Sequence, residues 1–429
     1  MSTTNRTILS IAAAAIFLAV AGWAYWQFFM NPPSAPLSPA SGTSQQGSGG
    51  FSPLQHGTGA TGTNGNGTGA ATTTTPGGAT SSQSSKLPTL RLLSDAPVGG
   101  YAASTTASTT IVRWADRGRG NIYEASYDSS AILTLSNTLV PKIIQSVWNR
   151  DLTAFVASMF QDGDLDPTTV YAELATRAAS STGSAPYALQ GKSVSGSVIG
   201  YAVSPDRTKM FMLLDQGGAG VGYVSSFNGK NLTQIFSTPL TELNVAWPAD
   251  GIIALTTKGS ASYNGYLYFV DPKAGTWKRA LGPLPGLSAS VSRTGKYVLY
   301  STANSQGVYT GIYSVASGTS TDAIIRTLAD KCAWGNTYRD LVYCGVPVQL
   351  PSGTYPNDWY LGTVSTVDGV WQINAANGEV HLISSIIDQS NRPVDTSGLS
   401  TDAKDHYLFF MNKNDLSLWS LDLSAAATK

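Results

Sequence analysis

Short apolar runs separated by tight polar turns recur along the chain from residue 87 to its end. Each repeat begins with a strand rich in small residues, passes through a polar turn and returns as a more apolar strand. Such alternation, bounded by turn residues, predicts β-strands rather than helices. The last inward position of the first strand recurs every 43 to 65 residues, at Ala103, Trp148, Val203, Trp247, Val291, Trp334 and Leu399. This spacing indicates seven repeats of one structural unit.

A second hairpin completes each repeat. Examples are YLYFVDPKAGTWKRAL from Tyr266 and VWQINAANGEVHLIS from Val370, in which two strands flank a turn of Asp, Asn and Gly. Such turns between alternating segments are a strong hairpin signal. Four short antiparallel strands in about 45 residues make up one blade of a β-propeller. The sequence therefore predicts an all-β fold, a seven-bladed β-propeller over residues 87–429.

The two ends of the repeat array complement each other. The last repeat ends with the segment Leu416–Leu423 and lacks a fourth strand, whereas the first repeat has a surplus strand at Leu90–Leu93. Pairing these segments removes two open strand edges, which would otherwise promote aggregation. We therefore expect Leu90–Leu93 to pair beside Leu416–Leu423 and to close the ring.

The turns of the repeats resemble those of TolB-type and WD-repeat-like β-propellers. The first two strands are joined as in SPDRTKMFML from Ser204 or SRTGKYVLYS from Ser292, and the last two as in VDPKAG from Val270. In those families a Ser-Pro-Asp-Gly-like turn and an Asp-x-x-x-Gly turn occupy these places. The resemblance covers residues 87–423 and implies the propeller architecture. Such propellers include enzymes, receptors and passive scaffolds, so the resemblance implies no particular activity.

An uncharged apolar segment, Ile8–Phe29, precedes the repeats. Its 22 residues are enough to cross a hydrocarbon core of about 30 Å as a helix. Aromatic residues at its end, such as Trp26 and Phe29, are typical of a membrane interface. The alternative is a signal peptide that is cleaved near the Ala-rich core. We favour an uncleaved, single-pass transmembrane signal anchor at residues 8–29.

Charge and composition predict how the remaining N-terminal segments are arranged. Arg6 is the only charged residue before Lys86. Because positive charge stays on the cytoplasmic side, we expect residues 1–7 to form a cytoplasmic tail and the C-terminal domain to be extracytoplasmic. Residues 30–86 are mostly Pro, Ser, Gly, Thr, Ala and Asn, which cannot bury enough apolar surface to become ordered. We expect a disordered linker with a span of roughly 40 Å.

The balance of charges and the few histidines exclude several functions. The 26 Lys and Arg residues equal the 26 Asp and Glu residues in number, so the net charge is zero. A chain without a basic excess neutralises few phosphates, and we expect no nucleic-acid partner. The three histidines are His56, in the linker, His381 and His406. They argue against a His-based triad or a three-His metal site, and we assign no catalytic residue and no cofactor.

One acidic segment is a candidate metal site. Asp162, Asp164 and Asp166 alternate along the chain, and Glu173 is the twelfth residue counted from Asp162. Calcium is bound by oxygens from positions 1, 3, 5 and 12 of such a loop. However, Pro167 stands where that loop needs a glycine. A solvated acidic turn is the favoured interpretation, and a weak Ca²⁺ site formed by these four acidic residues is the alternative.

The two cysteines, Cys332 and Cys344, lie on adjacent predicted strands of the sixth repeat. Outside the cytoplasm such a pair becomes oxidised when the strand register brings the Cβ atoms to about 4 Å. We therefore predict a disulfide, with two separately buried thiols as the alternative.

The longest insertion, Val346–Gly369, separates the second and third strands of the sixth repeat. It contains five candidate binding residues, which are Tyr355, Asn357, Asp358, Trp359 and Tyr360. Large aromatic side chains beside polar ones can stack on sugar rings or anchor a protein partner. We therefore predict a ligand-binding surface at this insertion. The alternative is a lid that folds back over its own blade.

These features together predict a membrane-anchored extracytoplasmic module that binds or scaffolds its partner, an envelope protein or a glycan. The alternative is an extracytoplasmic hydrolase that acts on glycan or peptide through acidic residues in the propeller mouth. The two hypotheses differ in one structural feature, the set of carboxylates that face the central channel.

Overall fold

The computed structural model describes residues 87–161, 163, 166–177, 185–304 and 307–426. The predicted cytoplasmic tail, membrane segment and linker, residues 1–86, lie outside the described residues. None of the helices in the described part of the chain has the length and apolar character needed to span a membrane. The described part consists of β-strands and a few short helices, as the repeat pattern predicts.

The elements follow one another in short steps along the chain. The strands are β1 (Leu90–Ser94), β2 (Val98–Thr105), β3 (Thr110–Asp116), β4 (Ile122–Ser126), β5 (Ile132–Ser136), β6 (Ile143–Trp148), β7 (Ala154–Met159), β8 (Thr168–Thr176), β9 (Tyr187–Ser193), β10 (Ser197–Val203), β11 (Lys209–Asp215), β12 (Gly220–Ser226), β13 (Thr233–Thr238), β14 (Leu243–Ala249), β15 (Ile252–Thr257), β16 (Asn264–Val270), β17 (Trp277–Pro285), β18 (Ser288–Val291), β19 (Tyr297–Asn304), β20 (Gly307–Ser314), β21 (Thr319–Asp322), β22 (Cys332–Trp334), β23 (Leu341–Pro347), β24 (Asp368–Asn374), β25 (Val380–Ser385), β26 (Thr396–Thr401), β27 (Tyr407–Asn412) and β28 (Leu418–Asp422). The short helices are η2 (Ala329–Lys331), α2 (Asn357–Leu361), α3 (Ile386–Ser390) and α4 (Leu423–Ala426).

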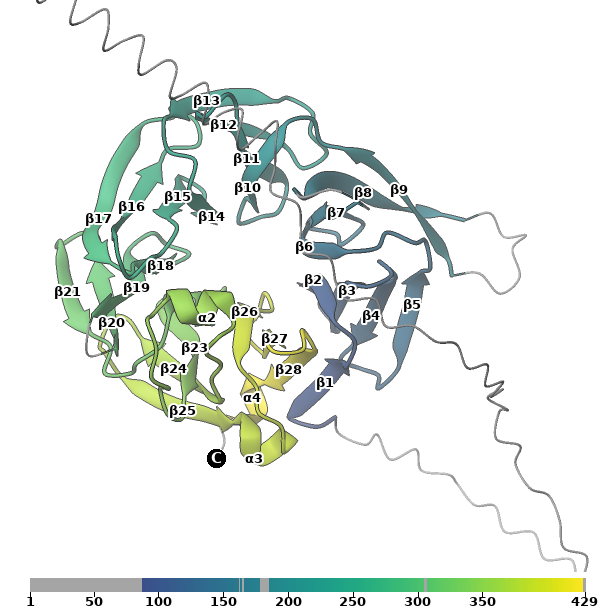
Figure 1. The fold of residues 1–429 in the computed structure, drawn as a ribbon. Helices are drawn as coiled ribbons and strands as arrows, with labels where there is room; N and C mark the ends of the chain where they lie inside the picture. The colour runs from purple at the N-terminus through teal and green to yellow at the C-terminus, as the bar shows by residue number, and fades with distance from the viewer. Residues whose placement is uncertain (1–86, 162, 164–165, 178–184, 305–306, 427–429) are drawn as a thin grey trace, which may run out of the picture. The chain divides into compact units, whose positions relative to one another are not determined.

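The strands of the described residues form five four-stranded sheets and one eight-stranded sheet. Four of the smaller sheets are antiparallel meanders in chain order, and in the fifth β1 completes the sheet of β26, β27 and β28. Figure 1 shows the sheets following one another around a ring, with the first strand of each repeat nearest the centre. This arrangement is an all-β propeller, and the predicted fold class is confirmed at this level.

The eight-stranded sheet contains two consecutive repeats. The strands β2 to β5 and β6 to β9 each form an antiparallel meander. The two meanders are joined by one parallel bridge between Ser136 on β5 and Tyr187 on β9. Neighbouring repeats therefore touch here at their outermost strands, and the prediction of seven separate blades is met only in part.

The predicted turns connect the first two strands of the repeats. After β10, Arg207 is left-handed with φ 57°, and its amide donates to the Ser204 carbonyl oxygen at 2.8 Å. After β18, Gly295 is left-handed with φ 69°, and its amide donates to the Ser292 carbonyl oxygen at 2.9 Å. One left-handed residue lets such a short turn reverse the chain. These turns place each second strand directly beside its first strand.

The core lies between successive sheets. Five successive residues of β11, Met210–Leu214, are buried. One core cluster joins Leu299 and Ile312 of one sheet to Trp334 and Val342 of the next. Sheets that are covered on both faces have near-continuous apolar strands, which explains the apolar second strand of each repeat.

The N-terminal strand closes the ring. β1 lies antiparallel beside β28, with Leu90 opposite Leu421 and Leu92 opposite Trp419. Leu93, only 2% exposed, lies in a core cluster with Phe409. The predicted closure, in which the first strand completes the last sheet, is confirmed.

A disulfide joins Cys332 on β22 to Cys344 on β23, and these residues face each other directly in the antiparallel register. Both cysteines are buried in the core cluster of this sheet. The predicted pairing of the two cysteines is therefore present in the structure.

The double variant Cys332→Ala/Cys344→Ala is expected to lower the free energy of unfolding by about 3 kcal/mol at most, because it reopens a short loop in the unfolded chain. The bridged residues are separated by 12 positions. Urea denaturation with and without reductant measures this loss. Reductant should shift the wild-type midpoint and leave that of the variant unchanged. Alkylation of two free thiols in the unreduced wild-type protein would contradict the prediction.

Candidate functional site

A cavity of about 950 Å³ is lined by the innermost strands β6, β10, β14, β18, β22 and β26. Each of these strands has a pairing partner on one side only within the described residues, so its free edge faces the ring interior. Part of the cavity wall is apolar, with residues such as Val147, Val245, Ala333 and Leu399. An apolar cavity with polar groups at defined places is typical of a ligand-binding site.

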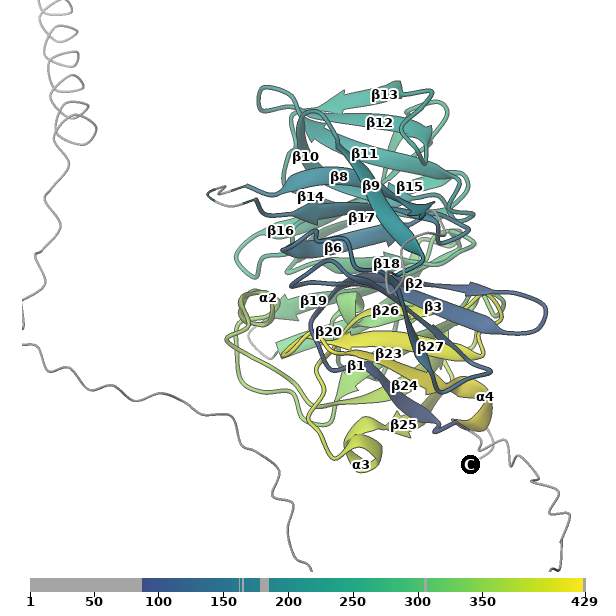
Figure 2. The same ribbon diagram turned by 90° about the vertical axis from the view of Figure 1, so that its right-hand side faces the viewer.

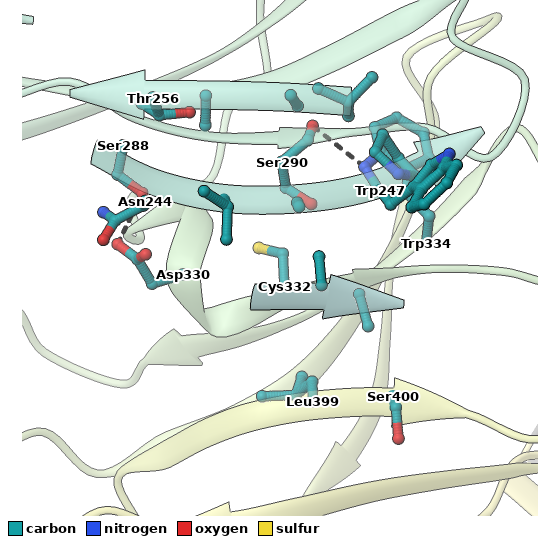
Figure 3. A pocket seen from close by; sticks show the side chains of 18 of the residues that line it. Asn244, Trp247, Thr256, Ser288, Ser290, Asp330, Cys332, Trp334, Leu399 and Ser400 are labelled. Carbon is teal, nitrogen blue, oxygen red and sulfur yellow. Dashed lines mark hydrogen bonds between the residues drawn. The ribbon is translucent and has the colours of Figure 1, made fainter. Parts of the chain in front are cut away.

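One end of the cavity, which we call the polar mouth, carries Asn244, Ser288, Asp330 and Tyr360. The Ser288 hydroxyl donates to Asp330 Oδ2 at 2.6 Å, and the Tyr360 hydroxyl donates to the same oxygen at 2.8 Å. Figure 3 shows Asn244, Ser288 and Asp330 together at this end. Burial, together with the charge of Asp330, raises the pKa of the Tyr360 hydroxyl well above its usual range, so Tyr360 remains a hydrogen-bond donor at neutral pH.

The opposite end, which we call the tryptophan end, carries Trp247 and Trp334. The Trp334 indole donates to the Ser290 carbonyl oxygen of the neighbouring sheet at 3.1 Å, as the dashed line in Figure 3 shows. The Trp247 indole nitrogen is buried and has no hydrogen-bond partner among the described residues. Both tryptophans occupy the aligned last inward position of their repeats. The repeat pattern therefore located this end of the cavity, although it did not show that a cavity exists.

The predicted binding insertion folds over one face of the ring and contains α2. Figure 2 shows α2 on the face opposite the turn between β2 and β3. Tyr355 and Trp359 are 3% and 5% exposed and pack in one core cluster with Leu328. Tyr360 is 38% exposed, and of the five predicted binding residues it is the one that lines the cavity. Tyr355 and Trp359 thus pack as the lid alternative describes, whereas Tyr360 is accessible to a ligand at the polar mouth.

The two polar candidates of the insertion have local partners. Asn357 Oδ1 accepts a hydrogen bond from the Ala261 amide at 2.7 Å, which ties α2 to the loop between β15 and β16. Asp358 Oδ2 accepts one from the Thr354 amide at 2.6 Å. Both side chains therefore fix the shape of the lid. Their predicted contact with a ligand stays a prediction.

Beneath the lid lies a buried ion cluster of Lys331, Asp368, Asp395 and Thr366. Lys331 Nζ is 2.7 Å from Asp368 Oδ2 and 2.7 Å from Asp395 Oδ1, and the three charged side chains are at most 2% exposed. The Trp359 indole donates to both oxygens of Asp395 at 3.0 Å. Burial alone would raise the pKa of Asp395, but Lys331 and the hydrogen bonds hold it below its usual range. The cluster fixes the lid to the strands that surround the polar mouth.

The acidic segment is only partly visible. Asp162 and Asp164 lie outside the described residues. Asp166 is exposed, and Glu173, on β8, accepts a hydrogen bond from the Tyr171 hydroxyl at 3.0 Å. Among the described residues no group of three or more His, Cys, Asp or Glu side chains is arranged to hold a metal ion. The calcium site remains an untested prediction.

The sequence did not point to Asp330 or Lys331 as site residues. Both lie on η2, in the segment that leads into the innermost strand β22. Charged residues between two repeats are usually solvated turn formers, so their types gave no signal. Their position directly before an innermost strand is the one feature that could have identified them.

No protein-family description matches this chain, and no curated protein matches it. Solved structures do resemble it. TolB from Acinetobacter baumannii aligns with a TM-score of 0.38 and 12% identity, over 75% of this chain and 62% of TolB. An oligogalacturonate lyase from Vibrio parahaemolyticus aligns with a TM-score of 0.44 and 10% identity, over 76% of this chain and 97% of the lyase.

A puromycin-hydrolysing peptidase from Mycobacterium tuberculosis aligns with a TM-score of 0.48 and 12% identity, over 75% of this chain and 53% of the peptidase. The alignment thus spans about half the length of that peptidase and less than two thirds of TolB. The chain is a β-propeller similar in structure to these proteins.

Proposed function

We propose that this protein is a binding module of the cell envelope that takes its ligand, a segment of an envelope protein or a glycan, at the polar mouth of the central cavity. The observation that carries this proposal is the cavity itself. Its volume of about 950 Å³ is large enough for several residues of a chain-like ligand. Donors and acceptors on Asn244, Asp330 and Tyr360 stand at one end of apolar walls, where they can orient such a ligand.

The proposal includes the predicted attachment to the membrane. Residues 8–29 would anchor the chain as a single-pass helix, residues 30–86 would form the linker, and the propeller would lie outside the cytoplasm. The disulfide between two buried cysteines supports an oxidising compartment. The proposal also includes seven blades. The eight-stranded sheet is taken as two blades, because its two meanders are joined by a single bridge.

A binding role is favoured over the hydrolase alternative by the carboxylates in the cavity. Hydrolysis of a glycan by the usual mechanism needs a pair of carboxyl groups on either side of the scissile bond. Of the described residues that line the cavity, Asp330 alone carries a carboxylate. Its Oδ2 already accepts hydrogen bonds from Ser288 and Tyr360. These contacts suit a fixed acceptor for a ligand.

The variant Tyr360→Ala is expected to reduce ligand capture at least tenfold, because it removes an aromatic wall and a hydrogen-bond donor from the polar mouth. The full-length chain is expressed in cells and treated with a membrane-impermeant crosslinker, and the captured proteins and glycans are quantified by mass spectrometry. Leu361→Ala is the matched control, because Leu361 is on the same helix, is 77% exposed and does not line the cavity. Equal capture by wild type and Tyr360→Ala would contradict the proposal.

A further inference from the structure

Two arginines lie beyond the tryptophan end of the cavity. Arg207 lies in the turn after β10, and Arg293 in the matching turn after β18. Arg293 lines the cavity. Arg207 Nη2 donates to the carbonyl oxygen of Ala103 on β2 at 2.7 Å. This hydrogen bond joins the turn after β10 to the innermost strand two repeats earlier in the chain.

Neither guanidinium has an ion-pair partner within 4 Å among the described residues. Arg293 is half-buried and has no hydrogen bond or ion pair with another described side chain. Arg207 is also half-buried, and its Nη1 atom is buried without a hydrogen-bond partner. Burial, and then the positive charge of Arg293, lower the pKa of Arg207 to about 10. The two groups therefore remain charged at neutral pH and lie close enough to repel each other.

One carboxylate, Asp405, acts on Arg293 from nearby, but its oxygens are already engaged. Asp405 accepts hydrogen bonds from the backbone amides of Asn336 at 2.8 Å, Thr337 at 2.9 Å and Tyr338 at 2.8 Å. These three donors fix the turn after β22 and satisfy the carboxylate. Arg339, in the same turn, adds a further positive charge that lowers the pKa of Arg293. Arg207, Arg293 and Arg339 thus bring three positive charges to this end of the ring, where Asp206 and Asp402 accept hydrogen bonds within their own turns.

We propose that the tryptophan end of the cavity binds an oxyanion, a carboxylate or phosphate group. Arg293 contacts the anion directly, and Arg207 contributes positive charge beside Arg293. The fork of a guanidinium matches both groups through paired hydrogen bonds. Partly buried cations without partners are costly, and an incoming anion offsets that cost. Trp247 and Trp334 line the same cavity as Arg293.

This inference rests on the proposed function in using the same cavity, and it specifies the chemistry of the ligand. The anionic group occupies the tryptophan end, a neutral or apolar body follows the walls, and polar groups reach Asp330 at the mouth. Two sources supply such an anion: a carboxylate at the end of a peptide, or a free phosphate ion. Both are recognised by the same guanidinium chemistry, so the ligands used in the test distinguish them.

The test titrates the full-length chain, purified in mild detergent, by isothermal calorimetry at constant ionic strength. The ligands are inorganic phosphate, the peptide acetyl-Ala-Ala-Ala with a free carboxylate, and the same peptide amidated. We expect saturable binding of phosphate, of the acid peptide or of both, and none of the amide. Phosphate binding alone identifies a small-anion site, and binding of the acid peptide alone identifies a chain-end site.

The variant Arg293→Gln should weaken binding at least tenfold, and Arg207→Gln should weaken it less. Lys296→Gln is the matched control, because Lys296 is in the same turn as Arg293, is exposed and does not line the cavity. Its affinity should stay within twofold of wild type. Thermal unfolding of each variant shows whether it is folded. The inference fails if no anion binds, or if Arg293→Gln binds as tightly as wild type. If Tyr360→Ala leaves ligand capture unchanged while the wild-type chain still binds an anion, the proposed function is rejected. The anion site is then retained.

Discussion

Replacing Lys331 by Met is expected to lower the free energy of unfolding by about 3 to 5 kcal/mol at pH 7, because it leaves two buried carboxylates without a counter-charge. Asp368 and Asp395 lie within 2.7 Å of the Lys331 ammonium and are fully buried. Thr366 also accepts a hydrogen bond from Lys331 Nζ, at 2.5 Å. Met keeps the length and the apolar stem of the side chain, so the loss reports the charge. Urea denaturation of the full-length chain measures it.

The matched control is Lys413→Met. Lys413 is a second lysine beside the same tryptophan, with Nζ 5.1 Å from the ring centre of Trp359, compared with 5.5 Å for Lys331. Lys413 is half-buried, and it is not an ion-pair partner of either carboxylate in the described residues. A cation beside an aromatic ring contributes about 0.5 to 1 kcal/mol, so this variant should lose no more than that. Equal losses in the two variants would contradict the assigned role of Lys331.

The dependence on pH gives the same prediction a second readout. In the wild type the pKa of Asp395 is below its usual range, so its contribution is present above the unfolded value of about 3.9 and is lost as the pH falls. In Lys331→Met the carboxyl group of Asp395 loses its counter-charge and binds protons more readily. The stability difference between the two proteins should therefore be largest near pH 7 and shrink toward pH 4. A difference that is independent of pH would mean that lost packing causes it.

The repeat pattern predicted the propeller because each strand pair is determined by residues that are close together in the sequence. Each strand pair is fixed by a turn of a few residues, such as Ser204–Arg207 or Ser292–Gly295, and the same pattern returns seven times. Closure by β1 also followed, since a missing strand at one end and a surplus strand at the other can be counted. The bridge between β5 and β9 could not be predicted, because it depends on the distance between the outermost strands of two neighbouring repeats.

The insertion shows where sequence reasoning stops. Tyr355, Trp359 and Tyr360 are similar in type, and composition alone does not tell an anchor from a lid. Tyr355 and Trp359 are four residues apart, but Tyr355 precedes the helix, which begins at Asn357, so helical spacing does not explain why the two pack together. Both are buried in one cluster, whereas Tyr360 lines the cavity.

The buried ion cluster depends on contacts that are distant in the sequence. Lys331 and Asp395 are 64 residues apart, and Asp395 enters through the next repeat. In a single sequence such residues are indistinguishable from the solvated charges of other turns. The same holds for Arg207 and Arg293, whose shared end of the ring follows only from the propeller geometry. The fold was therefore more predictable than either candidate site.

Deleting residues 87–94 is expected to abolish the single cooperative unfolding transition and to cause aggregation, because it removes the strand that closes the ring. The deletion exposes the edge of β28 and takes Leu93 out of the core. Truncating one buried leucine costs about 2 to 5 kcal/mol, so losing the whole strand approaches the 5 to 15 kcal/mol of a typical domain. Thermal unfolding and light scattering of the full-length and shortened chains measure the effect.

Arg91 adds a second reason for a large effect. Its guanidinium donates from Nη2 to the Ser130 carbonyl oxygen at 3.0 Å and lies 5.9 Å from the ring centre of Tyr127. It thereby ties the closing strand to the adjacent sheet. A deletion of equal length at residues 71–78, outside the described residues, is the matched control and should leave the unfolding transition unchanged.

The closing strand can also be supplied as a separate molecule, which distinguishes loss of the strand from a general effect of shortening the chain. A peptide with the sequence of residues 87–94 should bind the open edge of β28 by strand addition and restore the cooperative transition of the shortened chain. The same peptide with Leu90→Asp and Leu93→Asp should not restore it, because both leucines pack in core clusters of the ring. Equal rescue by the two peptides would show that pairing at the backbone suffices. A shortened chain that stays monomeric and melts like the full-length protein would contradict closure by β1.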